Sequence, residues 1–135
     1  MRSGAPAELA GSSSSRSARG VVVLTRADGS VVCERCVVAD RMLPRMKGLL
    51  GKRGLGAGEG LLIQPAPSIH TFFMRFPIDV VFLSKSGEVM KVAPSVRPWR
   101  MRSCRRAFAV LELPAGEAER RGITAGDHID RAEAA

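Results

Sequence analysis

The chain has 135 residues, of which 45% are hydrophobic and 25% charged, and its formal net charge at pH 7 is +8. This is the balance of a soluble globular protein, and we expect one globular domain over residues 20–132. No apolar run approaches the roughly 18 residues of a membrane helix, and the N-terminus lacks the apolar region of a signal peptide. We therefore predict a cytoplasmic protein that does not insert into a membrane and whose cysteines are reduced.

The positive charge is clustered. Residues 41–54 contain five cations and no acid, and residues 95–106 contain five arginines and no acid. Clustered cations favour an anionic partner, which here is an anionic small molecule or an acidic protein. The alternative is a solvated basic surface without a partner.

The first part of the chain predicts a tail, a hairpin and a helix. Residues 1–19 are rich in Ser, Ala, Gly and Arg and predict a disordered tail. Apolar runs at 21–24 and 31–38 flank the turn residues Asp28-Gly29 and predict an antiparallel hairpin. Apolar residues at helical spacing predict a short helix near residues 41–50.

The second part predicts mostly strands. Residues 61–63 indicate a short buried strand, and residues 80–83 and 88–93 flank a Ser84–Gly87 turn and predict a second hairpin. A loop, a strand, a helical turn and a final turn into a short strand follow at residues 94–106, 107–113, 116–121 and 126–129. This pattern indicates a mostly β (α+β) fold, a small antiparallel barrel or sandwich.

The stretch from 69 to 83 joins four of the five phenylalanines with a histidine and an aspartate. Asp79 stands among apolar residues, where a carboxylate is costly unless it is paired or hydrogen-bonded. It is a general base or a ligand-orienting acid, or else a structural ion pair or turn cap, with Arg75 and His70 as the nearest candidate partners. His70 shares a predicted strand face with Met74, and is either a core imidazole or a proton carrier that lines an apolar pocket.

Cys33 and Cys36 form a Cys-x-x-Cys pair, a spacing that can bind zinc or carry redox chemistry. On a regular strand, residues three apart point to opposite faces, so we expect the two sulfurs not to meet. A zinc site would also need two further ligands, from Cys104, His70 or His128. We therefore predict no metal and no cofactor, and an incidental surface position for Cys104.

The segment 97–106 mixes Trp99 with arginines such as Arg100. Arginine and an aromatic ring together can hold phosphates and stack a base. The chain has no tyrosine and no recognised nucleic-acid motif, so nucleic-acid binding is the lesser hypothesis. Glu112 lies between two leucines and should face away from both on an alternating strand. It is either solvated or aimed into a cleft.

Four blocks of residues together resemble the domain-of-unknown-function 192 family of prokaryotes. The blocks are 45–52, 58–63, 69–83 and 110–116, the last followed by Gly122 and Gly126-Asp127. The third block is the most specific and looks like a His-Thr-x-x-Met-Arg subgroup. The resemblance runs from about residue 31 to 130, and it implies a compact, largely β fold with a short helix. It implies no activity.

Two functional hypotheses follow. The first is a binding module with a pocket and a basic rim for an anionic small molecule or an acidic protein. The residues predicted to contact the ligand are His70, Met74, Arg75, Asp79, Glu112, Trp99 and Arg100. The second is a hydrolase-like or other acid/base enzyme, in which Asp79 or His70 moves the proton and Arg75 stabilises a developing anion. Binding is preferred because no nucleophile–base pair stands at a readable spacing. The oligomeric state stays open.

Overall fold

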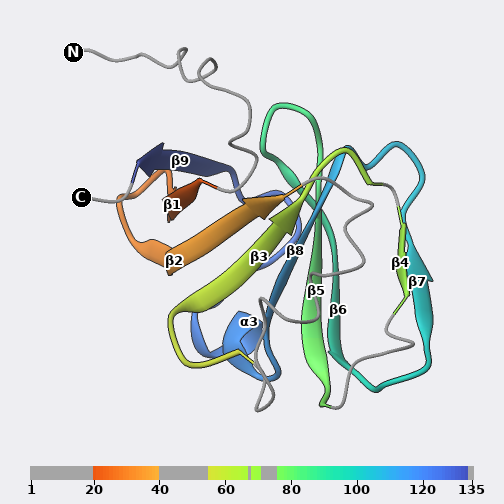
Figure 1. Cartoon of the computed structure of the whole chain (residues 1–135). Helices are drawn as coiled ribbons and strands as arrows, with labels where there is room; N and C mark the ends of the chain where they lie inside the picture. The colour runs from red at the N-terminus through yellow and green to blue at the C-terminus, as the bar shows by residue number, and fades with distance from the viewer. Residues whose placement is uncertain (1–19, 40–54, 67, 71–75, 134–135) are drawn as a thin grey trace.

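The computed structural model describes residues 20–39, 55–66, 68–70 and 76–133, and for Ile69, His70 and Glu133 it describes the backbone alone. Within these ranges the chain forms strands and one short helix (Figure 1). The elements are β1 (Val21–Arg26), β2 (Val31–Ala39), β3 (Glu59–Ile63), β4 (Ser68–His70), β5 (Ile78–Leu83), β6 (Val89–Val96), β7 (Met101–Ser103), β8 (Ala109–Pro114), α3 (Glu117–Arg120) and β9 (Ile129–Glu133). The predicted tail at 1–19 and the predicted helix at 41–50 lie outside the described residues.

Most of the strands form one mixed sheet. Its order is β6-β5-β8-β3-β2-β1-β9, and every neighbouring pair is antiparallel except the parallel pair β2–β3. The prediction of a mostly β fold with one short helix is confirmed. The architecture is an open mixed sheet and not a closed antiparallel barrel, because the end strands β6 and β9 form no ladder in the described ranges. An isolated antiparallel bridge between Glu88 and His128 joins the chain just before each of the two strands. No helix in the described ranges is long and apolar enough to cross a membrane.

β4 and β7 form a separate two-stranded antiparallel ribbon, called the β4–β7 ribbon below. It lies beside the β5–β6 end of the sheet (Figure 1). Residues 94–106 were predicted to be one loop, and this was wrong in part. β6 continues to Val96, and β7 occupies 101–103. A three-residue strand carries too little alternation to be distinguished from a loop in the sequence.

The two predicted hairpins are confirmed, and each turns at a glycine with positive φ. Gly29 has a φ of 90° between β1 and β2, and Gly87 has a φ of 99° between β5 and β6. A side chain at either position would strain the backbone, because L-residues rarely adopt this conformation. Asp28 supports the first turn by accepting a hydrogen bond from the Ser30 amide at 2.8 Å.

The sheet buries both of its faces, because side chains alternate along each strand. The cluster on the first face includes Leu24, Leu62, Val81, Leu111, Leu113 and, from α3, Ala118. The cluster on the second face includes Leu61, Ile78, Val80, Phe82 and Val110. Ala66 and Ala107, from the connections before β4 and after β7, join the second cluster. The helix therefore covers the first face, and the connections of the β4–β7 ribbon cover the second.

β2 is not a regular strand, and this overturns the expectation about the cysteines. Cys33 pairs with Leu24 and Cys36 pairs with Val22, so three steps on β2 match two steps on β1. This β-bulge inserts one residue and restores the alternation on the far side. Cys33 and Cys36 therefore share the first face, where both belong to the same buried cluster.

Candidate functional site

Asp79 is buried in β5, at 1% exposure, and both of its carboxylate oxygens accept backbone hydrogen bonds. Oδ1 accepts from the Ser95 amide and Oδ2 from the Ala118 amide, each at 2.8 Å. Ser95 lies in a bulge of β6 and Ala118 lies in the first turn of α3, so neither amide has a regular ladder partner. The carboxylate thus fastens the helix and the end of β6 to β5. Asp79 therefore positions these two segments relative to β5.

Glu112 is buried in β8, at 4% exposure, in different surroundings. Its register partners on the neighbouring strands are Leu61 and Val80. Within the described part of the chain, Oε1 of Glu112 has no hydrogen-bond partner. Burial raises the pKa of this carboxyl to about 8, because the charged form is poorly solvated there. At neutral pH the group is a protonated acid that can donate a hydrogen bond.

The two carboxyl groups do not line one site. Asp79 pairs with Leu113, and Glu112 pairs with Val80, so they stand one residue out of step on adjacent strands. One step along a strand reverses the face. Asp79 therefore lies on the first face with Leu113, and Glu112 on the second face with Val80. Asp79 and Glu112 do not form an acid–base pair.

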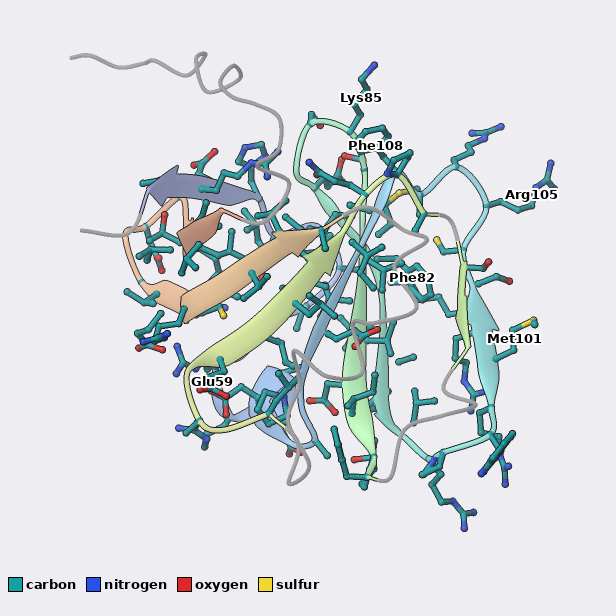
Figure 2. The ribbon with its side chains drawn as sticks, in the orientation of Figure 1. Glu59, Phe82, Lys85, Met101, Arg105 and Phe108 are labelled. Atoms are coloured by element: carbon teal, nitrogen blue, oxygen red, sulfur yellow. The ribbon has the colours of Figure 1, made fainter. Side chains whose placement is uncertain are left out.

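The β4–β7 ribbon brings two predicted regions together. His70 of β4 pairs with Met101 of β7, so the backbone of the central stretch lies beside the arginine segment. Trp99, just before β7, is 61% exposed, and Met101 is 59% exposed. Val21 is the remaining exposed large hydrophobic residue in the described ranges. Figure 2 shows Met101 and Arg105 pointing away from the seven-stranded sheet.

Arginines precede and follow these apolar residues along the chain. Arg100, Arg105 and Arg106 are exposed and Arg102 is half-buried. The set Trp99, Arg100, Met101, Arg102, Arg105 and Arg106 is called the β7 surface below. Sequence reasoning missed Met101, whose exposure is set by the pairing of β7 with β4. It also missed Lys91 of β6, whose Nζ donates to the Ser103 carbonyl at 3.0 Å and joins the end of β7 to the sheet.

The backbone of this region is held in an uncommon conformation. The non-glycine residues with positive φ in the described ranges are Ser95 at 48°, Trp99 at 66° and Arg106 at 71°. Such a conformation costs about 1–3 kcal/mol per residue and persists only where surrounding contacts impose it. At Ser95 the contact is the hydrogen bond to Asp79. Asp79 therefore shapes the segment that leads into the β7 surface.

The structure describes the remaining predicted residues only in part. The side chains of His70, Met74 and Arg75 lie outside the described residues, so their roles stay predictions. Cys104 is half-buried and packs against the second cluster. Among the side chains that the structure describes, no group of three or more His, Cys, Asp or Glu could hold a metal ion.

A hollow lies at the β2–β3 side of the sheet, next to the register partner of Glu112. None of the residues predicted to contact a ligand lines it. Its lining residues are Val21, Arg35, Val37, Leu55, Glu59, Gly60 and Leu61.

Comparison with known proteins places the chain in a family. The family model DUF192, described as "Uncharacterized ACR", matches residues 23–131. The chain belongs to the DUF192 family. The resemblance found in the sequence is thereby confirmed, whereas the His-Thr-x-x-Met-Arg subgroup stays a prediction.

Two relatives are similar to this DUF192 chain in sequence. A UPF0127 protein of Thermococcus sibiricus is 30% identical over 114 residues, which cover 81% of this chain and 73% of the relative. A UPF0127 protein of Pyrococcus furiosus is 36% identical over 64 residues, 47% of this chain and 54% of that protein.

Two crystal structures are similar to this DUF192 chain along most of their length. A protein of unknown function from Novosphingobium aromaticivorans is 27% identical, with a TM-score of 0.67 over 82% of this chain and 83% of that one. A Sinorhizobium meliloti protein, described as a candidate transcription regulator, is 24% identical, with a TM-score of 0.66 over 84% of this chain and 94% of that one. The second likeness supports the fold alone.

Proposed function

We propose that this DUF192 protein is a small binding module, and that its β7 surface binds an acidic segment of a partner protein. The observation that carries the proposal is the exposure of Trp99 and Met101, at 61% and 59%, within a segment that contains five arginines and no acid. Exposed apolar side chains with a charged rim are typical of interaction sites.

The charges favour an acidic partner. Residues 95–106 carry a charge of +5 at neutral pH, since they hold five arginines and no acidic residue. Arginine is well suited to carboxylates because its guanidinium presents paired N–H donors. Each exposed ion pair contributes about 0.2–1 kcal/mol, so affinity would come from several such pairs and from burial of the two apolar side chains.

The residues beside the arginines indicate which class of partner the surface binds. Single-stranded nucleic acid is usually bound on several stacked aromatic rings, and Trp99 is the one aromatic residue between 95 and 106. A small anion would be held in a concave site, whereas Trp99 and Met101 are both well exposed. An extended acidic peptide fits a flat, basic and partly apolar surface better than either.

The anchoring of this segment adds support. Asp79 holds the Ser95 amide at 2.8 Å, and Lys91 holds the Ser103 carbonyl at 3.0 Å. A preorganised surface loses less conformational entropy when it binds. The pocket predicted around His70, Met74, Arg75 and Glu112 stays a separate prediction. The enzyme hypothesis receives less support, because both oxygens of Asp79 already accept backbone hydrogen bonds.

The single tryptophan of the chain supplies the test, because Trp99 is itself in the proposed surface. The protein is titrated with a synthetic peptide rich in Glu and Asp that carries two leucines, and Trp99 emission is followed. We expect a blue shift as the indole leaves water, and weaker binding at higher salt. A peptide with Gln and Asn in place of the acids should bind at least tenfold more weakly.

Matched variants locate the site. The double substitution Arg105→Glu and Arg106→Glu should weaken the peptide affinity about tenfold, roughly 1.4 kcal/mol. Arg131→Glu in β9, at the far end of the sheet order from β6, should leave it unchanged. Equal binding of the acidic and neutral peptides, or equal loss in both variants, would contradict the proposal. Tighter binding of a single-stranded oligonucleotide would replace it with the nucleic-acid hypothesis.

A further inference from the structure

Cys33 and Cys36 are brought together by the bulge in β2. Both have 0% exposure and both face the first cluster, on the opposite side of the sheet from the connections of the β4–β7 ribbon. Cys33 Sγ donates a hydrogen bond to the Gly58 carbonyl at 3.4 Å, and Cys36 Sγ donates one to the Val37 carbonyl at 3.9 Å. Their environment is therefore independent of the β7 surface.

The register of β2 sets the span between the two cysteines. Their partners Leu24 and Val22 are two residues apart on β1, so the two cysteine Cα atoms are separated by about two strand steps, roughly 6.4–6.8 Å. Disulfides span Cα separations of about 4.4–6.8 Å. A regular strand would place residues three apart at roughly 10 Å and on opposite faces. The bulge thus brings the pair within the upper limit for a disulfide.

We infer that Cys33 and Cys36 form a redox-active dithiol, which closes to a disulfide by exchange with a low-molecular-weight disulfide. The inference rests on the shared face, the shared buried cluster and the span between the two cysteines. It stands apart from the proposed binding of an acidic partner.

The surroundings assign different roles to the two sulfurs. The pKa of the Cys33 thiol is lowered, first because the neighbouring Cys36 thiol can donate a hydrogen bond to the Cys33 thiolate and also because Arg121 lies near. The pKa of the Cys36 thiol is raised well above its usual value by the same interaction and by burial. Cys33 is therefore the attacking thiolate and Cys36 the resolving thiol.

The Cys33 sulfur is close to the backbone at Gly58 and Gly60. It donates a hydrogen bond to the Gly58 carbonyl at 3.4 Å, and a Cβ on Gly60 would come within 2.8 Å of the same sulfur. The 56–59 turn is closed by the Glu59 amide, which donates to the Gly56 carbonyl at 3.0 Å. Local opening of this turn would admit a small disulfide without unfolding the sheet.

The exchange balances in two steps. The Cys33 thiolate attacks one sulfur of the small disulfide, which forms a mixed disulfide and releases one small thiolate. Cys36 gives its proton to that thiolate and attacks the Cys33 sulfur, which releases the second small thiolate. This second thiolate takes up the proton that Cys33 had released to water. Two protein thiols are oxidised, and one small disulfide is reduced to two thiols.

The test uses the full chain with Cys104→Ser, which removes the third cysteine at a half-buried position. The native protein is incubated with excess oxidised glutathione, quenched by alkylation and weighed intact. We expect a mass loss of two hydrogen atoms and no alkylated thiols. In the further variant Cys36→Ser, a mixed disulfide should accumulate on Cys33, because no resolving thiol remains.

Two results would overturn the inference. One is a Cys104→Ser protein that keeps both thiols alkylatable in denaturant after native incubation with the oxidant. The other is a stable glutathione adduct while both Cys33 and Cys36 are present, since a neighbouring resolving thiol would displace it. Circular dichroism of each variant verifies that the sheet is folded during the incubation.

Discussion

Asp79 and Glu112 are both almost fully buried on neighbouring strands, yet their surroundings differ completely. Asp79 accepts two backbone hydrogen bonds at 2.8 Å on the first face. Glu112 lies among apolar side chains on the second face, where burial raises its pKa to about 8. Asp79 stabilises the fold through its two backbone hydrogen bonds, whereas Glu112 is stable in its surroundings because it keeps its proton.

The comparison teaches that burial of an acid does not by itself mark a catalytic group. The donors around it decide its role. Asp79 satisfies amides of a bulge and a helix start, so its contribution is structural and reaches the β7 surface only through Ser95. An uncharged side chain could replace Glu112 with little loss to the fold. The contact of Glu112 with a ligand stays a prediction.

The largest effect should come from Asp79→Ala. The substitution leaves the Ser95 and Ala118 amides without their acceptors, and each unsatisfied buried amide costs about 1–3 kcal/mol. We expect the free energy of unfolding, measured in urea, to fall by about 2–6 kcal/mol. Asp130→Ala, in exposed β9, is the matched control and should change it by less than about 0.5 kcal/mol. Similar losses in the two variants would end the assignment of a fastening role to Asp79.

Glu112→Gln should have a smaller effect, and one that depends on pH. The folded pKa of about 8 stands above the ordinary value of 4.5. Between these values the folded protein keeps the proton and the unfolded chain releases it. The stability of the wild type therefore falls as pH rises from about 4.5 to about 8, by up to about 1.4 kcal/mol per pH unit, and levels off above.

Glutamine carries no proton to lose, so the variant lacks this slope. Urea unfolding at pH 5, 6.5 and 8 gives the free energy of unfolding of both proteins. Between pH 5 and pH 8, the variant should gain a few kcal/mol of stability relative to the wild type. At pH 7 the substitution should be well tolerated, because the amide resembles a protonated acid. Parallel pH profiles for the two proteins would show that Glu112 is ionised in the folded state.

The smallest effect should come from Glu117→Gln, which tests an ion-paired carboxyl between the two extremes. Glu117 is 4% exposed, and it accepts hydrogen bonds from Arg120 and, at 2.6 Å, from Nε of Arg121. Arg121 keeps its pair with Glu34 at 2.9 Å, so the loss is partial. We expect the free energy of unfolding, measured in urea, to fall by about 1–2 kcal/mol. Glu119→Gln, exposed on the same helix, serves as the control. If Glu117→Gln lost as much stability as Asp79→Ala, the expected order of effects would be wrong.

Much of the fold could be predicted because it depends on local signals. The Asp28-Gly29 and Ser84–Gly87 turns fixed two hairpins, and alternation predicted that Glu112 faces away from its flanking leucines. The parallel pairing of β2 with β3 joins segments separated by the residues 40–58, and no local pattern encodes it. The bulge in β2 is likewise set by the register against β1, so the shared face of Cys33 and Cys36 could not be read from a regular alternation.

The candidate site could be predicted only in part. The sequence pointed to Asp79, and its alternative as a turn cap matches the backbone hydrogen bonds. It could not identify which amides Asp79 binds, because Ser95 and Ala118 are 16 and 39 residues away. Trp99 and the arginines were recognisable from composition. The exposure of Met101 depends on a three-residue strand pairing that only the folded chain defines.

The most direct test of the account is a map of amide chemical-shift changes in isotope-labelled protein on addition of the acidic synthetic peptide. If the β7 surface binds the peptide, the changes will be concentrated between residues 97 and 106, with β1, β9 and α3 unchanged. Changes concentrated around α3 and the first face, or none at a concentration that shifts Trp99 emission, would contradict it.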